Sequence, residues 1–167
     1  MDLAPGKLIL AFLLAALPAT AGGAAPGRAA SDSLGVEVHG HVRVFHRADL
    51  AGLRLDTVRA TFRGTAHTYT GVRLLDLLGR AGVAVDSAHG VNLVSRVLVE
   101  ASDGWRAVFS LPELLPAFAG RRVVLADRMD GANLPAAEGP FHLLAPDDGE
   151  EHARWVRQVV AIRVRAD

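Results

Sequence analysis

The stretch that most constrains the fold runs from Val97 to Leu144, where short apolar runs alternate with turn and capping signals. Asp103-Gly104 separates two runs with alternating apolar side chains, and this pattern predicts a β-hairpin. The following Ser110-Leu-Pro-Glu113 has the residues of a helical capping box, and two prolines restrict that helix to about one or two turns. The sequence therefore predicts two strands joined by one tight turn and followed by a short helix.

Further segments complete the expected fold. A buried strand is predicted at 123–126, a polar loop at 130–131 and a last apolar run at 141–144. The clearest helical pattern has leucines at 74, 77 and 78 and ends at Gly82. Strands are also predicted at 57–62 and at the C-terminus, where Val160, Ile162 and Val164 would share one face. Strands with few short helices indicate the α+β class, as mixed β-sheets with short peripheral helices.

The residues LGVEVHGHVRVF (34–45) predict a single half-buried strand with its valines on one face. His39 and His41 would then lie together on the polar face, close to His46. Imidazoles at this spacing are able to share a metal ion, but no carboxylate is placed as a third ligand. We therefore interpret these histidines as solvated side chains and expect no metal site.

The N-terminus has the pattern of an export signal. Lys7 precedes an apolar run at 8–17, and Ala19-Thr-Ala21 is a small-residue cleavage site. This predicts a signal peptide at 1–21, a flexible linker at 22–33 and one domain at 34–167. The apolar run is too short for a membrane anchor, so we expect a periplasmic or secreted protein.

Composition excludes several classes of function. The 18 basic and 18 acidic residues balance, and no basic cluster is present, so the sequence predicts no nucleic-acid partner. The absence of cysteine excludes disulfides, thiolate nucleophiles and zinc–thiolate sites. No hydrolase motif or glycine-rich phosphate loop is found.

A series of short motifs extends in order over nearly all of residues 36–164. Its members are Tyr69-Thr-Gly-Val, Asp103-Gly-Trp, Leu125-Ala, Asp130-Gly, Glu138-Gly-Pro-x-His and Arg154-Trp-Val. This ordered set resembles the molybdopterin-binding domain of the sulfite oxidase family. The resemblance implies the fold of that family, in which loops hold a pterin–dithiolene cofactor that carries molybdenum.

The chain also departs from the family pattern. In the family a cysteine thiolate ligates molybdenum just upstream of the helix start, but residues 57–72 contain no cysteine, and Tyr69 replaces the usual tryptophan. His142 stands where the family often has arginine, and Arg154 where it has lysine. The resemblance alone implies molybdopterin, whereas these departures predict that no cofactor is held.

The type of export signal leads to the same expectation. Enzymes of this family generally receive their cofactor in the cytoplasm and cross the membrane folded, through a twin-arginine signal. No adjacent arginine pair precedes the apolar run of this chain. We therefore expect the protein to be exported unfolded and to arrive without the cofactor.

Two functional hypotheses remain open. The first is a non-catalytic module that binds a small anionic ligand or a periplasmic protein partner. Its candidate pocket groups are Arg59, Arg63, His67, His142 and Arg154. The arginines are also typical of a solvated face, and His142 is either a core residue or a pocket residue. The second is a molybdopterin-dependent oxidoreductase with non-cysteine metal ligation.

Overall fold

A computed structural model of the chain describes residues 32–62, 64–86, 89–148 and 152–166. The predicted signal peptide and nearly all of the predicted linker lie outside these residues. Within them, no helix is both long and apolar enough to cross a membrane.

The first of two β-sheets, called sheet A, has five strands in the order β2, β1, β10, β5, β6. Only the pairing of β1 with β10 is parallel, and the other neighbours are antiparallel. The strands are β1 (Ser33–Val38), β2 (His41–His46), β5 (Ser95–Ala101), β6 (Arg106–Ser110) and β10 (Val159–Ala166). Sheet A therefore joins the two ends of the domain.

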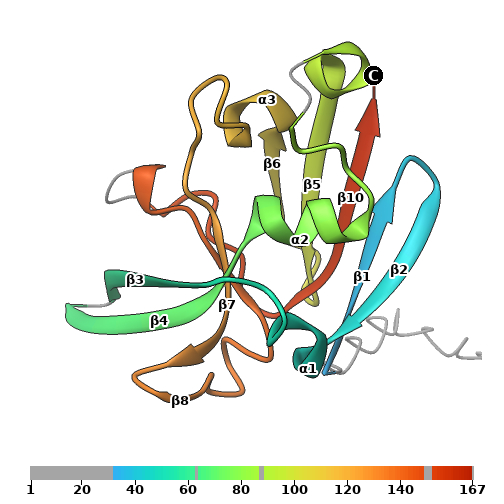
Figure 1. Ribbon diagram of the computed structural model, residues 1–167. Coiled ribbons are helices and arrows are strands. Elements are labelled where there is room, and N and C mark those ends of the chain that lie inside the picture. Colours follow the sequence, from blue (N-terminus) through green and yellow to red (C-terminus); the bar gives the residue numbers. More distant parts are fainter. Residues whose placement is uncertain (1–31, 63, 87–88, 149–151, 167) are drawn as a thin grey trace, which may run out of the picture.

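The second sheet, called sheet B, is antiparallel, and its long β3–β4 hairpin projects away from sheet A (Figure 1). Its strands are β3 (Leu55–Phe62), β4 (Thr65–Arg73), β7 (Val124–Met129), β8 (Ala132–Asn133) and β9 (His142–Leu144). The helices are short: α1 (Arg47–Leu50), α2 (Leu74–Ala81), α3 (Leu111–Leu114) and the 3-10 turns η1 (Gly90–Val94) and η2 (Pro146–Asp148). One mixed sheet and one antiparallel sheet with short helices confirm the expected α+β class.

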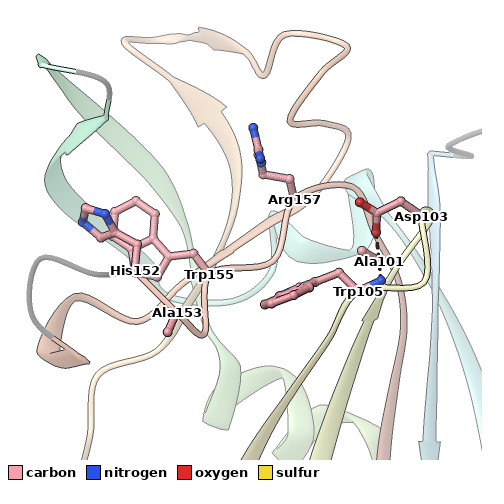
Figure 2. A pocket seen from close by; sticks show the side chains of 7 residues that line it. All are labelled: Ala101, Asp103, Trp105, His152, Ala153, Trp155 and Arg157. Carbon is pink, nitrogen blue, oxygen red and sulfur yellow. Dashed lines mark hydrogen bonds between the residues drawn. The ribbon is translucent and has the colours of Figure 1, made fainter.

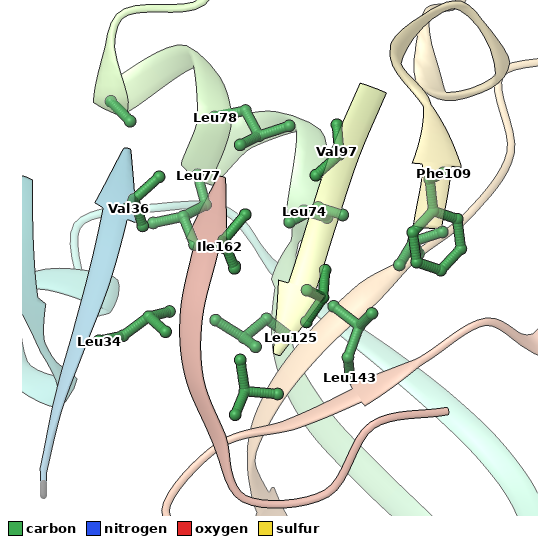
Figure 3. Close-up of a cluster of buried hydrophobic side chains, with 14 of the residues drawn as sticks. Leu34, Val36, Leu74, Leu77, Leu78, Val97, Phe109, Leu125, Leu143 and Ile162 are labelled. Atoms are coloured by element: carbon green, nitrogen blue, oxygen red, sulfur yellow. The ribbon is translucent and has the colours of Figure 1, made fainter. Parts of the chain in front are cut away.

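The main core lies between α2 and the two sheets. Leu74, Leu77 and Leu78 of α2 are fully buried and face sheet A, while Leu125 and Leu143 approach from sheet B (Figure 3). Each fully buried leucine contributes about 1.5–3 kcal/mol through burial. The helix ends as predicted at Gly82, whose φ of 117° is favourable for glycine. The buried leucines of α2 therefore pack between the two sheets.

Two other local predictions are also confirmed. The Asp103-Gly104 turn joins β5 and β6, and Gly104 has a φ of 89°. In the capping box of α3, Ser110 Oγ accepts from the Glu113 amide at 3.3 Å, and the Glu113 carboxylate accepts from the Ser110 amide at 2.8 Å. Both signals depend on residues close in sequence.

The single strand predicted at 34–45 is wrong, because the chain reverses at His39-Gly40. Both residues have positive φ, 47° and 88°, which suits a tight hairpin turn between β1 and β2. His39 therefore lies in the turn and not beside His41. The reversal also leaves Val42 and Val44 exposed at 64% and 59%.

The face predicted for Val160 is also wrong. The register between β10 and β5 shifts between Val159 and Ala161, which marks a β-bulge. Val159 is therefore buried with Ile162 and Val164, while Val160 is only half-buried.

Gly71 allows β4 and β7 to approach closely at an irregularity in their pairing. A Cβ atom at this position would lie 2.0 Å from the carbonyl oxygen of Leu125 and 2.4 Å from the Cα of Ala126. Both obstacles are backbone atoms of a central strand, so no side-chain rotation relieves the overlap. The glycine of the Tyr-Thr-Gly-Val motif is therefore required by the sheet.

A polar clamp holds the start of the β3–β4 hairpin to the segment before β7. Asp56 accepts from both Nε (3.0 Å) and Nη2 (2.5 Å) of Arg122, and also from Nε of Arg73 (3.0 Å). The Arg122 hydrogen bonds are the main cause that lowers the pKa of Asp56 to about 2. Since β4 also carries His67 and Tyr69, this clamp helps to position their side chains.

We predict that Gly71→Ala lowers the free energy of unfolding by at least about 3 kcal/mol, because the backbone of β4 must move away from β7. Urea unfolding measures this change. Gly35→Ala is the matched control, since a Cβ there has its nearest neighbour at 4.0 Å. Equal stability of the two variants would contradict the close approach.

We predict that Asp56→Asn lowers the free energy of unfolding at pH 7 by about 2 kcal/mol, from the pKa difference between 3.8 and about 2. Because the folded pKa is depressed, this stabilisation is complete above pH 3.8 and is lost as the pH falls through about 2. Urea unfolding at several pH values measures both effects. In Asp86→Asn, which changes an exposed side chain, stability should stay within about 0.5 kcal/mol.

Candidate functional site

The most unusual polar group of the domain is the buried carboxylate of Glu138. Its Oε2 atom accepts from the Tyr69 hydroxyl at 3.2 Å and pairs with Nδ1 of His142 at 3.0 Å. The three residues are exposed by only 8%, 0% and 2%. We call Tyr69, Glu138 and His142 the carboxylate cluster.

Sheet B positions the two partners of this carboxylate. Tyr69 on β4 pairs with Met129, and His142 on β9 pairs with Ala126, so β7 lies between them. Their side chains lie on the face of sheet B that packs with Leu134 and Leu144, apart from the main core. The cluster therefore depends on the order of three strands.

Backbone hydrogen bonds fix Glu138 itself. Its amide donates to the Pro135 carbonyl at 2.9 Å, and its carbonyl accepts from the Gln158 amide at 2.9 Å. The Gln158 side chain donates to the Ala136 carbonyl at 2.7 Å. These hydrogen bonds connect the loop before β9 to the segment before β10, and they fix the position of Glu138.

Contacts within the cluster and burial shift the pKa values of Glu138 and Tyr69. The hydrogen bond from His142 is the main cause that lowers the pKa of Glu138, opposed by burial, and Tyr69 and Arg157 lower it further. Burial, followed by the charge of Glu138, raises the pKa of Tyr69. Because an ionised carboxylate only accepts, Nδ1 of His142 must carry the proton between them. Among the described residues, Nε2 of His142 has no hydrogen-bond partner although it is buried.

Aromatic contacts extend the cluster on both sides. The Trp155 ring lies 5.9 Å from His142 and 6.5 Å from Tyr69, measured between centroids. On the other side, the His67 ring lies 6.3 Å from Tyr69, and its Nδ1 atom pairs with Asp130 at 2.8 Å. This hydrogen bond is the main cause that lowers the pKa of Asp130.

Next to the cluster lies an open pocket of about 410 Å³ that contains both tryptophans of the chain (Figure 2). Trp105 follows the β5–β6 turn and is 56% exposed. Trp155 separates the pocket from the carboxylate cluster, and the His152 ring lies 3.9 Å from its ring. Asp103 and Arg157 also line this space, which we call the tryptophan pocket.

The residues expected to form an anion pocket occupy different places. His67 and His142 both lie against the Tyr69 ring, with centroid-to-centroid distances of 6.3 and 5.5 Å. Arg59 is exposed on β3, where it pairs with Thr68, and Arg63 lies outside the described residues.

Arg154 points to another part of the molecule. Its guanidinium binds both carboxylate oxygens of Asp148, at 2.7 and 2.5 Å, and one of Glu113 at 3.1 Å. It also lies over the Phe109 ring, 4.3 Å from the centroid. These contacts give Arg154 a structural role, and a ligand site shared by the five residues stays a prediction.

Sequence reasoning missed Glu138, Trp105 and Arg157 as parts of the site. One local signal was available, since Glu138 and His142 are four residues apart on either side of a Gly-Pro turn. The contact of Glu138 with Tyr69 spans 69 positions, and no local pattern contains it.

Residues 35–167 match the family described as the oxidoreductase molybdopterin binding domain, and the chain therefore belongs to this family. This confirms the resemblance to the molybdopterin-binding domain of the sulfite oxidase family. No curated protein matches the chain in sequence.

A solved structure supports the fold. The chain is similar to the sulfane dehydrogenase SoxCD from Paracoccus pantotrophus, with a TM-score of 0.60 and 20% identity. The similarity covers 81% of this chain but only 38% of the SoxCD chain. At this identity the likeness concerns the fold alone.

Tyr69 is the only tyrosine, so the tyrosinate absorbance of the protein reports on the carboxylate cluster. We predict that Tyr69 of the folded protein ionises at a pH well above the ordinary tyrosine pKa. Burial and the Glu138 charge both make its negatively charged phenolate form less favourable. In Glu138→Gln the pKa should fall but stay above the ordinary value, because burial remains. An ultraviolet pH titration measures both, with protein unfolded in guanidinium as the reference. Ionisation of the folded protein at the reference pKa would contradict a buried cluster.

Proposed function

We propose that this chain is an exported domain of the sulfite oxidase family that has lost thiolate ligation of molybdenum and binds a small anionic ligand. The observation that carries this proposal is the tryptophan pocket, where two indoles and Arg157 surround an open space. The export pattern of residues 1–21 supports the location, and the family membership supports the scaffold.

The donors available to molybdenum do not fit the ligation used in the family. The resemblance places a cysteine thiolate within the segment 57–72, and none of the 167 residues is a cysteine. In the part of the chain that the structure describes, no three His, Asp or Glu side chains are grouped closely enough to hold a metal ion. Tyr69 of that segment is fully buried in hydrogen-bonded contact with Glu138. These features support a binding role without molybdenum chemistry.

The tryptophan pocket offers complementary chemistry for a planar anion. Indole faces stack well on flat ligands, and Trp105 is 56% exposed. Arg157 lines the same space, and a guanidinium is the side-chain group that pairs with a carboxylate or phosphate through two parallel hydrogen bonds. One carboxylate oxygen of Asp103 already has a partner, because it accepts from the Trp105 amide at 2.9 Å. A ligand with a ring and one acidic group would use the indole faces and the charge of Arg157.

Both tryptophans of the chain line this pocket, so intrinsic fluorescence reports ligand binding there. We predict a saturable fluorescence change with benzoate and a much weaker response to neutral benzamide, which has a similar ring. Arg157→Gln should weaken benzoate binding about tenfold or more, as expected for loss of a charged hydrogen bond. Inorganic phosphate tests the contribution of charge without a ring.

The matched control is Arg165→Gln, on the exposed part of β10, where the arginine pairs with Glu37. Its benzoate affinity should equal that of the unchanged protein. The proposal fails if neither benzoate nor inorganic phosphate gives saturable binding up to about 10 mM. A dissociation constant above that concentration is too weak for a specific site. The proposal also fails if Arg157→Gln binds benzoate as well as the unchanged protein does.

A further inference from the structure

A second pocket, of about 380 Å³, lies between α1 and sheet B and shares no lining residue with the tryptophan pocket. Its walls come from α1, the start of β3, the end of β4 and β7. The lining residues used below are Arg47, Leu50, Leu55, Val72, Asp127 and Arg128. We call this space the α1 pocket.

The polar groups of the α1 pocket are poorly satisfied. Asp127 is only 8% exposed, and among the described residues its carboxylate has one partner, Nε of Arg47 at 3.9 Å. This distance is too long for a hydrogen bond, and Nε of Arg47 is buried without one. The second contact of Arg47, with Asp32, is also long at 3.8 Å. Buried polar groups are normally hydrogen-bonded, so the buried Nε of Arg47 indicates a missing partner.

The remaining walls are apolar. Leu50 and Val72 are buried and form part of the wall, while Leu55 is 60% exposed at the start of β3. A leucine exposed beside a pocket is suited to cover the aliphatic part of a ligand. The pocket therefore combines an unsatisfied acid and base with a hydrocarbon surface.

We propose that the α1 pocket binds an aliphatic α-amino acid. The ligand ammonium donates to Asp127, its carboxylate accepts from Arg47 and Arg128, and its side chain packs on Leu55 and Val72. The charges agree with this class of ligand, since the lining carries both signs, with Arg47 and Arg128 beside Asp127. A site with both signs of charge favours a zwitterion over a simple anion or cation, because neither charge of the ligand is left unpaired.

Isothermal titration calorimetry with the full mature chain tests this proposal. We expect saturable binding of L-leucine, and at least about tenfold weaker binding of isocaproate, which lacks the ammonium, and of isoamylamine, which lacks the carboxylate. Glycine should also bind more weakly, because it has no side chain to bury.

Three variants test the assignment of residues. Asp127→Asn should weaken leucine binding about tenfold or more, whereas the exposed control Asp86→Asn should leave it unchanged. Circular dichroism checks that Asp127→Asn is folded. Leu55→Ser changes an exposed side chain and should weaken the binding of leucine but not of glycine, so the proposal stays testable even if Asp127→Asn does not fold.

The proposal is overturned if L-leucine gives no saturable heat up to about 10 mM. It is also overturned if isocaproate binds as tightly as leucine, or if folded Asp127→Asn keeps full affinity. Since the tryptophan pocket is separate, benzoate binding in the same preparation shows whether that site fails independently.

Discussion

The arrangement of the site depends on one shared acceptor, the buried carboxylate of Glu138. Tyr69 and His142 both bind it, so a single charge joins β4, β9 and the loop that precedes β9. Burying a carboxylate is unfavourable unless its oxygens find donors, so loss of either partner leaves an uncompensated charge. Through Gln158 the same loop is held to the segment before β10, and the cluster therefore connects sheet B with sheet A.

The fold could be predicted from the sequence where its signals are local. Periodic leucines and Gly82 gave α2, and Ser110 with Glu113 gave the start of α3. The β1–β2 reversal was missed because the valines on both sides of His39-Gly40 continue one alternating pattern. The bulge at Val160 was missed because it is defined by the register with β5 and not by the residues themselves.

The site was harder to predict than the fold for a related reason. Arginines are alike in a sequence, and only three-dimensional contacts separate Arg154, which is held by Asp148 and Glu113, from Arg157, which lines the tryptophan pocket. His142 was among the predicted pocket residues, but its partner is a glutamate assigned to a turn motif, which in turn binds a tyrosine far away in the chain. The resemblance to the sulfite oxidase family located the region, and the contacts defined it.

We propose that this scaffold is exported and folded without a bound molybdenum cofactor. The most direct test of this proposal is the metal and pterin content of the full-length chain, expressed in a host that makes molybdopterin and purified from the cell envelope or medium. Mass spectrometry for molybdenum and fluorescence for pterin should both give far less than one equivalent per chain. One molybdenum and one pterin per chain would contradict the account.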